Sequence, residues 1–251
     1  MLGAAGLATA ASLTACSAVE DVDGPALSEG VLSDRYGLHA PRWRLALPRS
    51  GPPRGLVISL HGFGATAETT FDLGYADAVE ASRMALVSVD GGNGYWHGRN
   101  DGTDSGAMVR EELVPLALDR SGLAADTAVT LLGWSMGGFG ALLIASDLGP
   151  SRVSSVVAAS AALWLTGSET PARAYDGRAD FDQHSIFGRT RRLSDIAVRL
   201  DCGTSDPFIG ANRTLAARLA DAETHFVEGG HDDEFWRDQA AAEMVWAAQR
   251  A

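Results

Sequence analysis

Short runs rich in apolar residues, most of them followed by a turn and a longer helical pattern, recur along this chain. They stand at 56–60, 84–89, 129–134, 153–159, 197–202 and 224–228. A strand buried on both faces has a continuous apolar run instead of an alternation of apolar and polar residues. Strands that alternate with helices predict a mostly parallel sheet with helices on both faces. We therefore expect an α/β domain that binds its ligands beyond the carboxyl ends of the strands.

The composition fits one soluble domain of this class. Of the 251 residues, 46% are hydrophobic and 21% are charged, and the net charge is −12. So acidic a chain offers no electrostatic footprint for a phosphate backbone, and we expect no nucleic-acid partner. The sequence holds no H-E-x-x-H, C-x-x-C or P-loop motif, so neither a metal nor an organic cofactor is expected.

The N-terminal segment has the composition of a secretion signal. Residues 2–15 are almost all small or apolar, and this run is too short to span a membrane as a helix. It ends in Leu13-Thr14-Ala15-Cys16, which resembles the lipobox of bacterial lipoproteins, whose cysteine carries the lipid. No Arg or Lys precedes Arg35, whereas signal peptides begin with a positive stretch. Either the true start lies upstream of Met1 or the segment works poorly, and the alternative to a signal peptide is a disordered apolar tail or a misassigned start.

These features predict the organisation of the chain. We expect a signal peptide over 1–16, a polar tether over 17–33 and one folded domain over 34–251. The protein is then extracytoplasmic, either secreted or lipid-anchored, and its only membrane contact is the N-terminal anchor. Residues 161–194 break the alternation of strands and helices, and we interpret them as a short cap over the sheet. An ordinary surface loop with a small core of its own is the alternative. No oligomeric state is predicted.

The motif Gly133-Trp134-Ser135-Met136-Gly137 has the form G-x-S-x-G. In a chain with 29 glycines this form arises readily by chance, so its context carries the inference. The motif directly follows the strand run at 129–132 and directly precedes the helical pattern at 138–145. A strand–turn–helix context is what a nucleophile elbow requires, because the tight turn needs glycine on either side of the serine. The pattern predicts Ser135 as a nucleophile.

The loop after the first apolar run, His61-Gly62-Phe63-Gly64, stands where this architecture supplies a backbone N–H to an oxyanion hole. The second donor is the residue after the nucleophile. We therefore expect the backbone N–H groups of Phe63 and Met136 to form the hole. His61 is interpreted as a structural residue of this loop.

A serine nucleophile needs a base, and the base needs a carboxylate to hold its tautomer. His231 follows the last strand run in a glycine-rich loop and is preferred over His97, the next best placed. Asp206 follows the strand that ends at Cys202 and is preferred over Asp201 and Asp232 as the acid. The chain order serine, aspartate, histidine is that of α/β-hydrolases.

The segment from Asp90 to Arg99 should line the substrate pocket by its position after a strand. In this interpretation Tyr95 and Trp96 form an apolar wall, and Arg99 meets an anionic group of the substrate. A hydrogen-bonded surface loop is the alternative.

Three motifs together resemble the putative esterase family, which includes the esterase D-like S-formylglutathione hydrolases and, more distantly, the mycolyltransferases of the antigen 85 group. They are the elbow, the segment Gly203-Thr204-Ser205-Asp206-Pro207-Phe208, and Gly229-Gly230-His231-Asp232-Asp233-Glu234-Phe235-Trp236. The resemblance extends from about Leu56 to Trp236. It implies an α/β-hydrolase fold, an acid at Asp206, and a catalytic histidine at His231 that opens an H-x-x-x-x-W segment.

The function expected from these residues is hydrolysis of a small-molecule carboxylic ester through an acyl-enzyme. An acyltransferase or a peptidase that uses the same three residues is one alternative. A non-catalytic binding lipoprotein on a hydrolase scaffold is the other, because a fold alone does not establish a function.

Overall fold

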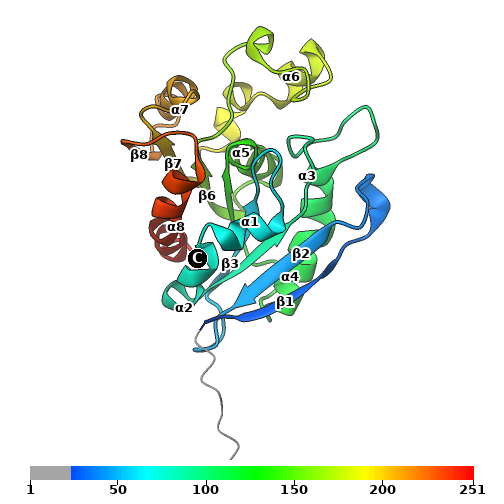
Figure 1. Cartoon of the computed structure of the whole chain (residues 1–251), viewed down its shortest axis with the longest axis vertical. Helices are drawn as coiled ribbons and strands as arrows, with labels where there is room; N and C mark the ends of the chain where they lie inside the picture. Colours follow the sequence, from blue (N-terminus) through cyan, green and yellow to red (C-terminus); the bar gives the residue numbers. More distant parts are fainter. Residues whose placement is uncertain (1–23) are drawn as a thin grey trace, which may run out of the picture.

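The computed structural model describes residues 24–251, so the predicted signal peptide and Cys16 lie outside the described residues and stay predictions. Eight strands form one sheet in the order β1-β2-β4-β3-β5-β6-β7-β8. β2 pairs antiparallel with both β1 and β4, and all other neighbours are parallel. Helices cover both faces of this sheet (Figure 1), as the sequence predicts.

The strands are β1 (Ala26–Val31), β2 (Arg42–Leu47), β3 (Gly55–Leu60), β4 (Met84–Val89), β5 (Val129–Trp134), β6 (Val153–Ala159), β7 (Ala197–Gly203) and β8 (Glu223–Val227). The α-helices are α1 (Ala67–Asp72), α2 (Val79–Ser82), α3 (Ser105–Met108), α4 (Val114–Arg120), α5 (Met136–Leu148), α6 (Arg178–His184), α7 (Ile209–Ala216) and α8 (Asp233–Ala248). Single turns of 3₁₀ helix occupy Asp34–Tyr36, Tyr75–Ala78, Gly167–Glu169, Ile186–Gly188 and Thr190–Arg192. None of the helices within 24–251 is both long enough and apolar enough to cross a lipid bilayer.

The sheet separates two apolar cores, and its central strands β3 and β5 are therefore buried on both faces. In β3, Leu56 and Ile58 point into the core beneath α3, α4 and α5, while Val57 points into the core beneath α2 and α8. Continuous apolar runs therefore predicted these strands correctly, since residues facing either side meet a helix layer.

The predicted tether over 17–33 is wrong for residues 26–31, which form β1 at the edge of the sheet. In this strand, half-buried residues alternate with exposed ones. The strand therefore has no fully buried run that would mark it in the sequence. It is held by antiparallel pairing with β2 along its whole length, and Gly30 packs so closely on the Trp43 ring that a Cβ there would lie 2.7 Å from a ring carbon.

Two helical stretches of the described chain are irregular. Between β3 and β4, α1 is separated from the 3₁₀ turn at Tyr75–Ala78 and from α2 by Gly74, whose φ of 82° no right-handed helix accommodates. Between β4 and β5, α3 and α4 flank a π-helical turn at Val109–Leu113.

The segment 160–196 between β6 and β7 holds α6 and three 3₁₀ turns, and it extends beyond α5 at the top of the view in Figure 1. It packs through aromatic contacts: Trp164 lies 5.7 Å from Tyr95 and 5.5 Å from Phe208, between ring centroids. The segment is thus anchored to loops at the carboxyl edge of the sheet, which is where the sequence interpretation places a cap.

A buried polar network lies between the sheet and α8. The Tyr75 hydroxyl donates to Glu243 at 2.7 Å, and Arg199 donates to Asp201 at 2.7 Å. Burial, followed by the neighbouring Asp201 charge, raises the pKa of Glu243 well above its usual range. The protonated, neutral form of Glu243 is therefore favoured in this core.

Candidate active site

The turn between β5 and α5 holds Ser135 with φ 55° and ψ −119°. This left-handed backbone is strained by about 1–3 kcal/mol for a residue with a side chain. A Cβ on Gly137 would lie 1.8 Å from the Leu60 carbonyl oxygen, and one on Gly133 would lie 2.4 Å from the carbonyl carbon of Gly137. The glycines of the motif are therefore required because the helix, the turn and β3 meet with no room for a methyl group.

The structure brings Ser135, His231 and Asp206 together from three separate loops. The Ser135 Oγ lies 2.9 Å from the His231 Nε2, and the His231 Nδ1 lies 2.8 Å from the Asp206 Oδ2. Each ring nitrogen of His231 thus has one oxygen partner. The serine proton, the imidazole and the carboxylate stand in series, which is the arrangement of a nucleophile, its base and an orienting acid.

Asp206 is 2% exposed, and its second oxygen accepts the backbone N–H of Phe208 at 2.7 Å. The two aspartates that the sequence ranks below it are engaged elsewhere. Asp201 pairs with Arg199, and Asp232 caps α8 by accepting the N–H of Phe235. Asp206 alone of the three bonds to the imidazole of His231.

Aromatic rings confine the imidazole of His231. Its centroid lies 5.3 Å from the Phe208 ring and 5.1 Å from the Trp236 ring, the latter in an edge-on arrangement. The loops after β7 and β8 come so close that a Cβ on Gly203 would lie 2.3 Å from the Gly229 oxygen. Packing on two sides fixes the ring orientation, which a proton-transferring base needs.

A cleft of about 410 Å³ opens over Ser135 and His231. Its other lining residues are Gly62, Phe63, Gly64, Ala65, Thr69, Trp134, Asp233 and Trp236. Among these, Thr69, Trp134, Asp233 and Trp236 escaped the sequence interpretation. Trp134 and Trp236 had a signal, because both stand inside the motifs that identify the nucleophile and the base.

The N–H groups predicted for the oxyanion hole are available. Within residues 24–251, neither the Phe63 N–H nor the Met136 N–H is taken up by an acceptor. The Gly64 N–H, in contrast, is used by the Asn93 side chain at 2.7 Å. Met136 opens α5, so its N–H also carries the positive end of the helix dipole toward the site.

His61 is a buried structural residue. The Gly91 N–H donates to its Nε2 at 2.9 Å, and its Nδ1 lies 2.7 Å from the Gly62 oxygen. Burial lowers the pKa of His61, so the ring is neutral. It links the loop after β3, which carries Phe63, to the loop after β4.

The predicted pocket residues are wrong for Trp96 and Arg99. Trp96 is fully buried, where its ring packs so closely on Gly91 and Gly140 that neither position tolerates a Cβ. Arg99 lies outside the cleft and pairs with Asp176 at 2.8 Å. A loop position after a strand does not reveal where a side chain turns: Trp96 turns into the core, and Arg99 turns toward Asp176.

Tyr95, the third predicted pocket residue, stands behind the cleft. It is 5% exposed, and its ring lies 6.4 Å from the Phe63 ring, which is 42% exposed on the cleft surface. Arg173 of the segment 160–196 lies over the other part of this wall, with its guanidinium carbon 4.3 Å from the Phe63 ring centroid. Phe63 thus forms the apolar wall of the cleft that the sequence analysis assigned to Tyr95 and Trp96.

Cys202 is buried within β7. Burial raises the pKa of its thiol to about 12, so the group remains protonated and is no competing nucleophile.

The model of the protein family described as "Putative esterase" matches residues 42–247. This range contains β2 to α8 and all three residues of the Ser135 site. None of the curated proteins matches the chain.

Several solved structures share the fold. One is FphF of Staphylococcus aureus, a fluorophosphonate-binding serine hydrolase: TM-score 0.79, 14% identity, covering 90% of this chain and 99% of that one. An S-formylglutathione hydrolase from Agrobacterium tumefaciens has TM-score 0.76 and 17% identity over 90% and 96% of the chains. MPT51 (FbpC1) of Mycobacterium tuberculosis has a TM-score of 0.70 and 17% identity, with 88% of this chain and 97% of that chain covered. These likenesses confirm the predicted α/β-hydrolase fold.

Proposed function

This chain belongs to the putative esterase family and is a carboxylic ester hydrolase, and we propose that it acts through an acyl-enzyme formed on Ser135. The observation that carries the proposal is the series of two hydrogen-bonding distances, 2.9 Å and 2.8 Å, from Ser135 through His231 to Asp206. A serine hydroxyl is a weak nucleophile, and this series supplies the base that activates it.

In the proposed mechanism the Ser135 Oγ attacks the ester carbonyl carbon while its proton passes to the Nε2 of His231. The Asp206 carboxylate accepts the Nδ1–H bond, which holds the tautomer and stabilises the imidazolium that forms. The tetrahedral intermediate collapses, the C–O bond to the alcohol breaks, and His231 returns the proton to the departing alcohol oxygen. A water molecule then attacks the acyl-enzyme with His231 as its base, and Ser135 is regenerated.

The backbone N–H groups of Phe63 and Met136 are proposed to bind the oxyanion. Both are free of other acceptors within residues 24–251 and both stand beside Ser135. One such donor contributes about 2.7–4 kcal/mol to transition-state stabilisation. The hydrogen bond from Gly64 to Asn93 holds the Phe63 loop open toward the cleft.

The cleft favours a compact small-molecule ester. Its volume of about 410 Å³ is in the lower part of the range of small-molecule sites, roughly 300–1,000 Å³. Phe63, Trp134 and Trp236 offer apolar contact, and Asp233 sets a negative charge at the rim. The Arg173 guanidinium over the Phe63 ring sets a positive charge on the other side, so we expect compact uncharged esters to be accepted best.

The test is hydrolysis of p-nitrophenyl esters from acetate to palmitate by the wild type, Ser135→Ala and Ser194→Ala. Ser194 is an exposed serine outside the site and serves as the matched control. We expect activity with the shorter esters in the wild type and in Ser194→Ala, and a loss of about 10⁴-fold or more in Ser135→Ala.

A fluorophosphonate probe separates the mechanism from the substrate. Because such probes phosphonylate activated serines, intact mass should show one adduct on the wild type and none on Ser135→Ala. Labelling without hydrolysis of any ester would move the reaction toward acyl transfer or peptide cleavage. Absence of both would overturn the proposed nucleophile.

A further inference from the structure

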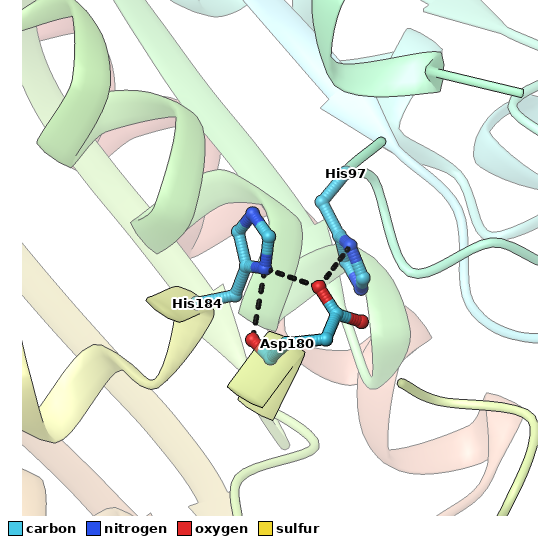
Figure 2. A group of neighbouring side chains, drawn as sticks. All are labelled: His97, Asp180 and His184. Carbon is cyan, nitrogen blue, oxygen red and sulfur yellow. Dashed lines mark hydrogen bonds and ion pairs between the residues drawn. The ribbon is translucent and has the colours of Figure 1, made fainter. Parts of the chain in front are cut away.

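A second histidine–carboxylate group lies outside the cleft of Ser135. Figure 2 shows His97, Asp180 and His184, with the Asp180 carboxylate directed between the two imidazole rings. The Nδ1 of His184 lies 2.8 Å from the Asp180 Oδ1, and the Nδ1 of His97 lies 3.8 Å from the same oxygen. All three ligand atoms lie within 4.8 Å of one another. None of these residues lines the active-site cleft.

Backbone groups contact all three side chains. The two ring nitrogens of His97 face carbonyl oxygens at 3.1 Å, the Nε2 that of Ala174 and the Nδ1 that of Gly98. The Nδ1 of His184 lies 3.0 Å from the Asp180 carbonyl oxygen. The Asp180 Oδ2 accepts the Asp176 N–H at 2.8 Å, which leaves the Oδ1 for another partner. Metal-binding histidines and carboxylates are held by outer hydrogen bonds in this way.

A neutral imidazole at His97 carries one proton, so one of its two nitrogens must set a lone pair against oxygen. A ring protonated on Nε2 sets its Nδ1 lone pair against two oxygens, the Gly98 carbonyl at 3.1 Å and the Asp180 carboxylate at 3.8 Å. Its ring stacks on the His184 ring at 4.4 Å between centroids. A lone pair set against oxygen atoms is unfavourable unless a cation lies between them.

The separations suit a transition-metal ion. Ligands at 2.0–2.1 Å around a tetrahedral Zn²⁺ are about 3.3 Å apart. The two nitrogen–oxygen distances, 2.8 Å and 3.8 Å, fall on either side of this value, so small side-chain rotations bring the ligands to coordination distance. Two imidazole nitrogens and one carboxylate oxygen are a donor set that zinc accepts in proteins.

The group borders a solvent-open cavity of about 530 Å³ whose lining includes Asp104, Asp176, Asp180 and His184. Arg99 is the one cation among the lining residues, and Asp176 already pairs with it. The cavity is therefore net acidic. It offers an entry path for a cation and room for a water as the fourth ligand.

We propose that His97, Asp180 and His184 form a Zn²⁺ site completed by water from this cavity. Its role is to fasten α6 of the segment 160–196 to the loop between β4 and α3, which carries His97. Asp180 and His184 are one helical turn apart, so both reach the ion from the same face of α6. The ion would fix the loop that also holds Tyr95 behind the Phe63 wall.

The test uses the full chain, free of any affinity tag and stripped with a chelator, titrated with ZnCl₂ in a calorimeter. We expect one saturable equivalent assigned to this site. His184→Ala and Asp180→Asn should each weaken it by at least about tenfold. Two matched controls should bind as the wild type does: Asp182→Asn on the same helix, and His39→Ala, whose side chain is 94% exposed. Circular dichroism checks that each variant is folded.

Absorption spectroscopy with Co²⁺ provides a second measurement that is independent of calorimetry. Co²⁺ added to the stripped protein should give the visible absorption of a nitrogen-ligated ion in the wild type and the controls, and lose it in His184→Ala. The proposal is overturned if the wild type binds neither metal saturably, or if both ligand variants bind Zn²⁺ as tightly as the wild type.

Discussion

Two groups of histidine and aspartate in this molecule differ in how their atoms face one another. Around His231 the partners are in series: Asp206 meets one ring nitrogen and Ser135 meets the other, at 2.8 Å and 2.9 Å. Around Asp180 they converge, since the Nδ1 atoms of His97 and His184 face the same oxygen. A series passes a proton from one end to the other, whereas a convergent set holds a cation. The same residue types thus serve different chemistry.

The two groups also rest on different supports. Ser135, Asp206 and His231 follow β5, β7 and β8, which are adjacent or nearly adjacent strands of one sheet. His97 and the pair Asp180 and His184 come from a loop and from the seven-residue helix α6. Proton transfer needs geometry held within fractions of an ångström, which a sheet edge provides. A metal ion can instead hold together ligands from elements that share no hydrogen-bonded sheet.

The largest expected effect separates the two groups by function. His231→Ala removes the proposed base and should lower kcat/KM for an ester by about 10⁶-fold. Zn²⁺ binding at the other group should remain unchanged, because no residue is shared. Ester kinetics and calorimetry on the same preparation check this pair of outcomes. Retention of more than about one hundredth of the wild-type activity would contradict the assignment of His231.

The next largest effect tests whether the turn that carries Ser135 is as rigid as we infer. Gly137→Ala places a methyl group on the Leu60 carbonyl, 1.8 Å away, and should lower stability by about 3 kcal/mol or more. For a domain of this size, the melting temperature then falls by about 6–12 °C.

Gly188→Ala in the segment 160–196 is the matched substitution, since a Cβ there meets nothing within 4 Å. It should change stability by no more than about 0.5 kcal/mol. Equal melting temperatures for the two variants would show that the turn around Ser135 accommodates an added methyl group. The turn would then be no more rigid than the segment 160–196.

The smallest expected effect is the pH dependence of stability due to Glu243, a buried carboxyl group outside both histidine groups. The pKa of Glu243 is raised in the folded protein by burial and by Asp201, so the native state keeps a proton that the unfolded chain releases above its ordinary pKa of 4.5. Stability from this group is therefore complete below that value and is lost as pH rises toward the folded pKa. Glu243→Gln keeps the neutral form and should abolish this loss.

The measurement is the melting temperature of wild type and Glu243→Gln from mildly acidic to alkaline pH. As pH rises, we expect the melting temperature of Glu243→Gln to increase relative to that of the wild type by about 2–4 °C. Glu234→Gln, on the exposed side of the same helix, should run parallel to the wild type. A constant difference across the range would show that Glu243 is ionised in the folded protein.

Strand-end residues were predictable because buried parallel strands leave continuous apolar runs, and the residues after them face one edge. Ser135, Asp206 and His231 were found in this way, and the structure brings them together. β1 escaped because it is a short edge strand with no buried residue: its half-buried and exposed positions alternate, and its sequence shows neither a continuous apolar run nor a polar–apolar alternation. Trp96 and Arg99 were misplaced because the inward or outward turn of a loop side chain depends on distant partners, here Gly140 and Asp176.

The group at His97 escaped for the same reason. The spacing of Asp180 and His184 suggests one helical face, but nothing in the sequence joins them to His97, some 80 positions earlier. Their meeting depends on the fold of the segment 160–196 over the loop after β4, and loops packed on loops leave no periodic pattern.

The segment 160–196 leaves the sheet at the end of β6 and returns at the start of β7, and these strands are direct neighbours. Its first residues are tied to the elbow, since the Ala162 N–H donates to the Ser135 carbonyl oxygen at 2.9 Å. An evolving lineage could therefore lengthen, shorten or exchange only the outer part of this excursion while Ser135 and His231 keep their positions. Such a change would alter the surface around Phe63, over whose ring Arg173 of this segment lies, and leave the reaction as it is.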